Sequence, residues 1–207
     1  MTGGPTWIPI DDVRIISNKS SGQLAHDIAH YLSRQGAKTT LLEGPVTDAF
    51  KSGAVRVIKF QFYAELSTLL RQELKKGYDI VIHAAAVSDY RLHRPLARKL
   101  KRTSHLTLRL EATPDIVGGL ARRKGRRVVV GFALESDRLL ARAKRKLEEK
   151  QLDLLVANRV NGTGHPFGER PVSVVLLDRR GNHSTLRSIS KQTLARRLLD
   201  RIEKMAA

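Results

Sequence analysis

Residues 13–22 read Val-Arg-Ile-Ile-Ser-Asn-Lys-Ser-Ser-Gly, and the expected fold is organised around them. The first half is rich in β-branched side chains (Val13, Ile15 and Ile16) and predicts a buried strand. The second half is small and polar, and a helix with apolar spacing begins at Leu24. A strand that enters a helix in this way leaves the unpaired amides of the first helical turn open to an anion. The stretch therefore predicts a phosphate-binding turn, while an ordinary capped helix remains an equal alternative.

Composition restricts the class of protein. The 207 residues suffice for one buried core, and no linker or repeat divides them, so we expect a single domain over residues 1–207. Cysteine is absent, which excludes disulfide bonds and thiolate catalysis and favours a reducing compartment. No apolar run approaches the ~20 residues that span a bilayer, and no signal-like segment opens the sequence. A soluble, cytoplasmic protein is expected.

The formal net charge of +18 predicts affinity for anions such as nucleic acid, phosphorylated metabolites or acidic surfaces. Aromatic residues make up only 5% of the chain, which argues against a base-stacking surface for single-stranded nucleic acid. We interpret the charge as a mainly solvated basic surface with a phosphate-handling site inside it.

Strand and helix signals alternate along the chain. Strands are expected at residues 13–16, 38–42, 55–60, 78–87, 127–133 and 152–156, and helices at 21–35, 64–76, from 114, and at 137–150. Residues 172–177 and 184–188 flank a glycine turn and predict a hairpin, and Ser190 is expected to cap a last helix at 191–205. This order predicts an α/β fold: a Rossmann-like, mostly parallel sheet with helices on both faces and an antiparallel edge hairpin.

Residues 91–110 interrupt this alternation. They are basic and polar until residues 106–110, where apolar and polar side chains alternate as in a half-exposed strand. The segment predicts either a strap over the site or a dimerisation arm.

Two strands end in polar residues. The apolar run at 78–87 suits a strand that is covered on both faces, and it ends at Ser88, Asp89 and Tyr90. Ligands bind at such carboxyl ends in open α/β sheets. The small alanines at 84–86 would let a ligand approach the backbone, or would serve tight packing between helix and sheet. A second polar end follows at residues 157–162.

Three cations recur at four-residue spacing on the helix expected at 137–150, for which Asp137 is the expected cap. Arg142, Lys146 and Lys150 share one face, and like charges at this spacing repel one another. An anionic ligand would offset that repulsion. The alternative is a solvated basic face in which Glu148 and Glu149 neutralise the row.

Taken in order, these motifs resemble the phosphopantothenate–cysteine ligase family over essentially the whole chain. The matching segments are residues 4–6, 9–22, 84–91, 99–102, 113–117 and 131–136, followed by Lys146, Lys150 and the pair Ala157 and Asn158. Each motif is modest, but their order and spacing together are specific.

The resemblance implies a Mg²⁺-dependent ligation in two steps, which belongs to coenzyme A biosynthesis. A nucleoside triphosphate, CTP in most bacterial members and ATP in eukaryotic ones, activates the carboxylate of 4′-phosphopantothenate as an acyl nucleotidylate and releases pyrophosphate. The amine of L-cysteine then displaces the nucleoside monophosphate. Many bacterial members carry a flavin-dependent decarboxylase ahead of the ligase. The 207 residues leave no room for that domain, so a stand-alone ligase without FMN is expected here. Family members are homodimers that exchange the strap.

The resemblance also implies roles for individual residues. Asn18 and Lys99 would be catalytic, with Asn18 on the acyl intermediate and Lys99 on the strap reaching the triphosphate or acyl phosphate. Arg14, Ala85 and Ala86 would adjoin the phosphopantothenate site. The nucleotide would be bound by Ser20, Ser21 and Gly22 at its phosphates, by Pro114, Asp115, Ile116, Val117 and Phe132 around the base and ribose, and by Asp89, Lys146 and Lys150. No side chain is assigned to the metal.

The sequence departs from the family pattern at several positions. Gln23 and Ala25 replace the lysine and second glycine of Ser-Ser-Gly-Lys-x-Gly, and Arg159 stands where aspartate is usual. Ile8 replaces a common acidic residue and Ser136 a usual threonine. A catalytically diverged, basic module that binds nucleotide or nucleic acid on the same fold is therefore the alternative function. A nicotinamide-linked reductase is disfavoured, because the glycine fingerprint after the first strand is missing.

Overall fold

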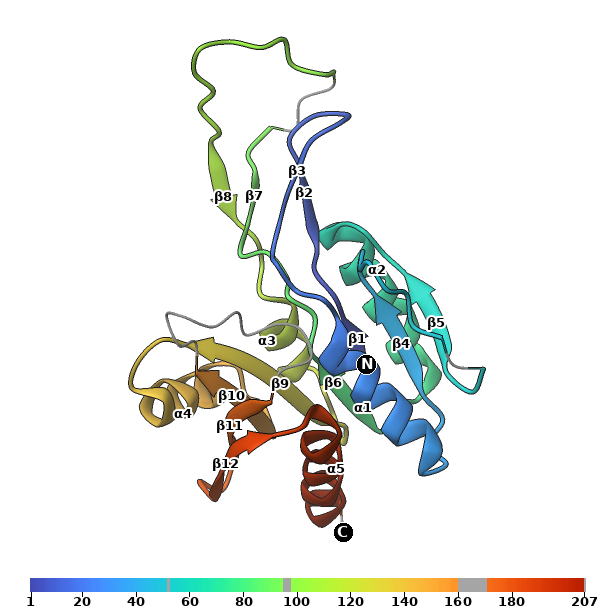
Figure 1. Cartoon of the computed structure of the whole chain (residues 1–207). Helices are drawn as coiled ribbons and strands as arrows, with labels where there is room; N and C mark the ends of the chain where they lie inside the picture. The colour runs from blue at the N-terminus through green and yellow to red at the C-terminus, as the bar shows by residue number, and fades with distance from the viewer. Residues whose placement is uncertain (52, 95–97, 160–170, 207) are drawn as a thin grey trace.

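An eight-stranded sheet in the order β12-β11-β10-β9-β6-β1-β4-β5 forms the centre of the molecule (Figure 1). The computed structural model describes residues 1–51, 53–94, 98–159 and 171–206. The parallel strands are β1 (Thr2–Gly3), β4 (Thr40–Glu43), β5 (Arg56–Lys59), β6 (Ile80–His83), β9 (Val128–Glu135) and β10 (Leu154–Arg159). At one edge β11 (Val172–Asp178) and β12 (His183–Ile189) continue the sheet as an antiparallel hairpin. The predicted mostly parallel α/β fold with an antiparallel edge is confirmed.

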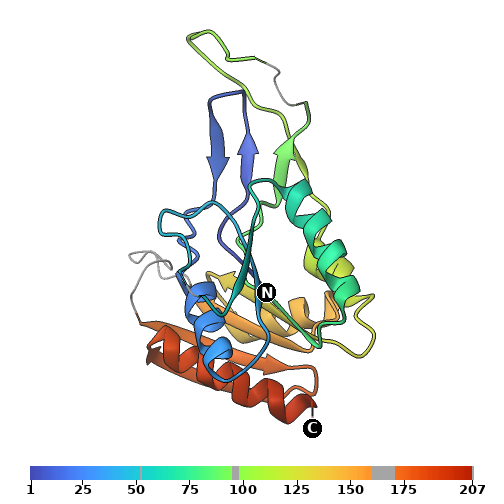
Figure 2. The ribbon, with the colours of Figure 1, turned by 90° about the vertical axis from the view of Figure 1, so that its right-hand side faces the viewer.

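Helices cover both faces of the sheet (Figures 1 and 2). They are α1 (Gln23–Arg34), α2 (Tyr63–Glu73) with the 3₁₀ turn η1 (Leu74–Lys76), α3 (Ile116–Ala121), α4 (Leu139–Glu149) and α5 (Lys191–Ala206). Neighbouring residues of a strand point to opposite faces. Ile82 and Val130 accordingly pack against α1 and α5, and Val81 and Val129 pack against α3 and α4.

The stretch at residues 13–17 is not a strand of this sheet. It forms β3 (Ile15–Ser17), which pairs antiparallel with β2 (Trp7–Pro9) in a hairpin that projects from the sheet (Figure 1). Val13 is 65% exposed and Ile15 41% exposed. The prediction of a buried strand here is wrong, because β-branched side chains favour an extended backbone but do not specify what covers it. The first strand of the sheet is instead β1, in which Thr2 pairs with both Leu42 and His83.

A second hairpin, β7 (Tyr90–Leu92) with β8 (Leu110–Ala112), projects beside the first one. We call residues 7–17 and 90–112 together the arm. The half-exposed strand predicted at 106–110 only begins at Leu110, and Leu106 is 53% exposed in an irregular segment. Residues 95–97 of the predicted strap, and residues 160–162 of the second predicted polar strand end, lie outside the described residues.

Most helix ends follow the predicted signals. Gly36 and Gly77 stop α1 and η1 with φ of 81° and 78°, a region that favours glycine. Ser190 caps α5, since its Oγ accepts the Thr193 N–H at 3.1 Å. The prediction that Asp137 caps α4 is wrong: the helix begins one residue later, after Arg138, and the Asp137 carboxylate pairs with Arg142 at 2.8 Å. Among the described helices, none combines the length and apolar character needed to cross a membrane.

Candidate functional site

A cavity of about 670 Å³ lies where the parallel strands end. The segments after β6 and the last residues of β9 and β10 line it from the sheet, and the first residues of α1, α3 and α5 line it from the helices. Because α1 and α5 cover one face of the sheet and α3 and α4 the other, groups from both faces meet in one space. This is the edge at which open α/β sheets bind ligands.

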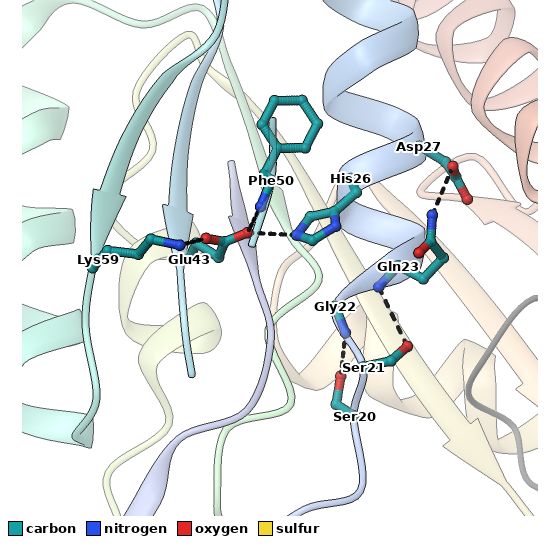
Figure 3. Close-up of polar contacts among 9 residues, drawn as sticks. All are labelled: Ser20, Ser21, Gly22, Gln23, His26, Asp27, Glu43, Phe50 and Lys59. Atoms are coloured by element: carbon teal, nitrogen blue, oxygen red, sulfur yellow. Dashed lines mark hydrogen bonds and ion pairs between the residues drawn. The ribbon is translucent and has the colours of Figure 1, made fainter. Parts of the chain in front are cut away.

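The serine-rich bend at residues 18–22 forms one wall of the cavity. Gly22 precedes α1 with φ of 73°, and a Cβ at this position would lie 2.8 Å from Val46 Cγ1, so glycine is required. The Ser20 and Ser21 hydroxyls accept the Gly22 and Gln23 N–H groups only loosely, each at 3.4 Å (Figure 3). No acidic side chain lies in the first turn. Backbone amides and hydroxyls are thus available to an anion.

Gln23 stands at the position of the family's lysine and does not supply a charge. Its amide donates along α1 to Asp27 Oδ1 at 3.1 Å (Figure 3). Ala25 stands where the family has its second glycine, and it lies against Gly3, on which a built Cβ would be 2.2 Å from Ala25 Cβ, so Gly3 has no room for a side chain. Helix α1 therefore starts in close contact with β1, which holds the bend near the sheet.

A buried polar cluster supports the start of α1 from behind. Glu43, at the end of β4, is fully buried and accepts hydrogen bonds from the His26 imidazole, the Phe50 N–H and the Lys59 ammonium (Figure 3). Burial lowers the pKa of His26, against the opposing charge of Asp27. The cluster ties α1 to β4, β5 and the loop at residue 50. Neither Glu43 nor His26 was singled out from the sequence, because their partners are distant along the chain.

The alanine stretch after β6 forms the second wall. Asn18 Nδ2 donates to Ala86 O at 2.9 Å, so the bend and this stretch lie side by side. Two threonine hydroxyls, of Thr2 and Thr6, accept the N–H groups of Ala85 and Ser88 at 3.2 and 2.9 Å. The stretch is thus held by hydrogen bonds to its backbone, and its small side chains leave the adjacent space open.

Ion pairs form the third wall. Asp115 accepts the Gly118 N–H at 3.2 Å and lies 3.0 Å from Lys150 Nζ. Burial acts to raise the pKa of Asp115, but the Gly118 N–H and the Lys150 charge outweigh it and lower the pKa. Lys146 Nζ lies 2.6 Å from Oε1 of the buried Glu135.

The predicted row of three cations is therefore paired with carboxylates outside its own helix. Arg142 pairs with Asp137 and, at 3.7 Å, with Glu135. The proposed neutralisation by Glu148 and Glu149 is not what the structure shows, since Glu149 pairs with Arg145 at 3.6 Å. Sequence spacing revealed the row, whereas its partners come from β9, from Asp137 in the segment after β9, and from the cap of α3.

The structure brings all but two of the predicted site residues to this cavity. Those that line it are Asn18, Ser20, Ser21, Gly22, Ala85, Ala86, Asp89, Pro114, Asp115, Ile116, Val117, Phe132, Lys146 and Lys150. The remaining two lie on the arm: Arg14 donates to Leu100 O at 3.1 Å, and Lys99 is the exposed residue before Leu100.

Of the residues that the structure describes, seven polar ones line the cavity but were not predicted site residues, and three of them, Asn158, Lys191 and His83, lie in β10, α5 and β6 respectively. Asn158 belongs to a recognised motif but had no role assigned, and the buried Lys191 begins α5. His83 is the polar residue of an otherwise apolar strand, and that contrast is the signal that could have identified it.

Within the described residues, no group of three or more histidine, aspartate and glutamate side chains could hold a metal ion. Asp89 is an exposed carboxylate after the alanine stretch, and it lines the same cavity as the serine-rich bend. A metal that binds here would take most of its ligands from a bound phosphate, as Mg²⁺ commonly does.

Comparison with known proteins matches residues 1–205 to the family model described as "DNA/pantothenate metabolism flavoprotein C-terminal domain". A relative named cysteine/cysteine sulfinic acid decarboxylase, from an unknown prokaryotic organism, is 36% identical over 88% of this chain and 51% of its own length. The coenzyme A biosynthesis bifunctional protein CoaBC of Bacillus subtilis (strain 168) is 34% identical over 98% of this chain and 50% of its own. The chain thus spans about half the length of these relatives.

Among solved structures, the crystal structure of the C-terminal domain of coenzyme A biosynthesis bifunctional protein CoaBC superimposes with a TM-score of 0.82. The sequences are 29% identical, and the match covers 99% of this chain and 92% of that one. The fold described above is therefore that of this C-terminal domain.

Proposed function

The chain belongs to the family of the DNA/pantothenate metabolism flavoprotein C-terminal domain, and from that membership we propose that it ligates 4′-phosphopantothenate to L-cysteine in coenzyme A biosynthesis. The observation that carries the proposal is the single cavity in which the serine-rich bend, the alanine stretch and the Asp115–Lys150 pair meet. The three walls offer separate contacts for the phosphopantothenate, for the triphosphate of the nucleotide and for its nucleobase. The printed names of the CoaBC relatives, which refer to coenzyme A biosynthesis, support the same assignment.

The proposed reaction has two steps. A carboxylate oxygen of the acid attacks the α-phosphorus of CTP or ATP, and pyrophosphate leaves. The amine of cysteine then attacks the acyl carbon, and the nucleoside monophosphate leaves. Ser20, Ser21 and Gly22 bind the phosphates, and Asn18 is placed between them and the alanine stretch by its bond to Ala86 O. The main contribution of the bend is to hold the carboxylate of the acid next to the α-phosphate of the nucleotide.

The base and ribose occupy the wall made by residues 114–117 and Phe132, and the acid lies against Ala85 and Ala86. Asp89 and the nucleotide phosphates would hold Mg²⁺, which neutralises negative charge on the triphosphate when bound. The lysine side chains Lys146 and Lys150 face the same space. Each lysine is paired with a carboxylate, which partly cancels its positive charge. The two lysines therefore orient the nucleotide as well as attract it.

We further propose a cytoplasmic homodimer that forms through the arm. Five large apolar side chains of the arm are exposed: Val13, Ile15, Tyr90, Leu106 and Leu110. A second copy of the chain would cover them, and would bring its own strap toward this cavity.

The purified protein should release pyrophosphate only when Mg²⁺, 4′-phosphopantothenate and either CTP or ATP are all present, and cysteine should raise steady turnover. A coupled pyrophosphate assay with the two nucleotides side by side measures this. Release without the acid would contradict the proposal. Nucleotide binding without any release, together with steeply salt-dependent binding to random DNA, would support the diverged binding module instead.

Replacing Lys150 by glutamine should raise the dissociation constant of the nucleotide by about tenfold, the scale of one lost charge-assisted contact. The amide also leaves Asp115 without its ionic partner, so the wall near the base loosens. Arg145→Gln is the matched control, because it removes one positive charge from the adjoining helix α4, and the partner of Arg145 among the described residues is the exposed Glu149. Isothermal titration calorimetry measures both; equal affinities of the two variants would remove Lys150 from the site.

A further inference from the structure

His83 is a buried histidine that the proposed reaction leaves without a role. It is the last residue of β6, is 7% exposed and lines the cavity. Alternation along β6 places it on the same face as Val81, which packs against α3 and α4. Its imidazole is therefore on the side of Asp115 and Lys150, and the charges of both act on it.

The hydrogen bonds of Thr2 favour one tautomer of the His83 ring. Thr2 Oγ1 accepts the Ala85 N–H at 3.2 Å and lies 3.0 Å from His83 Nδ1. In the part of the chain that the structure describes, Nδ1 is the acceptor to which this hydroxyl can donate. If Thr2 donates to Nδ1, the proton of the neutral ring is on Nε2.

Nε2 is then a hydrogen-bond donor, and it has no partner among the described residues. Burial lowers the pKa of His83 to about 4. The Asp115 charge opposes this shift, and the charges of Lys150 and the Met1 amino group add to it. The ring thus stays neutral near pH 7 and offers a donor without adding a positive charge to the cavity.

We propose that His83 binds an anionic oxygen in the cavity through Nε2–H, supplied either by a phosphate group of the nucleotide or by the carboxylate of the acid. The assignment rests on the proposed function and deepens it. The donor lies beside the alanine stretch assigned to the acid and faces the Asp115–Lys150 pair assigned to the nucleotide. Its expected ligand is an oxygen near the junction of the two substrates.

Two substitutions separate this role from a purely structural one. His83→Asn keeps an amide where Nδ1 meets Thr2 but has no group at the position of Nε2, whereas His83→Gln reaches the position of Nε2. We expect His83→Asn to raise the dissociation constant of the bound ligand by about tenfold, and His83→Gln to stay within about threefold of wild type. Separate titrations with CTP, with 4′-phosphopantothenate and with both identify which oxygen is bound. Wild-type affinity of His83→Asn for all three, or weaker binding by Gln than by Asn, would overturn the proposal.

Nitrogen NMR of the histidine rings tests the tautomer in the wild-type protein. His83 should be the neutral Nε2–H form from pH 5.5 to 8, and its Nε2 signal should shift when the ligand binds. A protein that releases pyrophosphate but shows no shift would retain the ligase function and disprove the role of His83. A protein without pyrophosphate release, in which CTP still shifts the signal and His83→Asn weakens binding, would retain that role and disprove the ligase. Absence of binding by both ligands would disprove both.

Discussion

Replacing Lys99 by glutamine should lower turnover by about 10²-fold or more, the scale for losing one charged partner of the transition state. This effect requires the strap to bring Lys99 to a cavity, because Lys99 does not line the cavity of its own chain. It lies on the arm, where the Leu100 N–H donates to Asp11 Oδ2 at 3.0 Å and Arg14 donates to Leu100 O. These bonds join the strap to the turn between β2 and β3, at the end of the first hairpin away from the sheet (Figure 1).

The control for this variant is Lys101→Gln, which removes the same charge two residues along the strap from an equally exposed position. It should keep near wild-type turnover. Near-normal turnover of Lys99→Gln in the same assay would remove Lys99 from the mechanism.

Mixing Lys99→Gln with Asn18→Ala tests how the strap reaches a cavity. If the strap is exchanged between copies, each mixed dimer has one cavity with both native residues, so about a quarter of wild-type turnover should return after subunit exchange. If the strap instead closes over its own cavity, the mixture should stay as inactive as its components. The tagged mixed dimer, separated by chromatography from the parent dimers, should show about half of wild-type turnover, because one of its two cavities has both native residues.

Replacing Glu43 by alanine should lower the free energy of unfolding by about 3–5 kcal/mol, the range for removing one partner of a buried ion pair. The change leaves the buried His26 imidazole and the Phe50 N–H without their acceptor. Lys59 contributes less, because more than half of its side chain is in solvent. The start of α1 should also loosen, so affinity for the nucleotide should fall together with stability.

Urea unfolding followed by circular dichroism measures this loss. Glu148→Ala, an exposed change on α4, is the control and should cost less than about 0.5 kcal/mol. Glu43→Gln should fall between the two, because the amide keeps one oxygen acceptor but loses the charge. A loss below about 1 kcal/mol for Glu43→Ala would show that the cluster does not support the bend.

The first strand of the sheet was assigned to the wrong segment of the sequence, and the reason is physical. Residues 13–17 do form a strand, as their β-branched side chains predict, but the strand pairs with β2 on the arm and not with the sheet. The strand that begins the sheet is two residues long, too short to give a periodic signal. It is placed between β4 and β6 by its partners, which lie about 40 and 80 residues further along the chain.

The sequence by itself determined the alternation of strands and helices, the glycine stops and the small polar residues at strand ends, because each of these depends on a few neighbouring residues. It also placed the serine-rich bend and most of the cavity's lining residues in the right segments. Only the tertiary structure decided which charges meet: Glu43 with His26, Asp115 with Lys150, and Thr2 with His83. The physical reason is that such contacts join strands distant in the chain, so their geometry follows from sheet order and burial and not from local spacing.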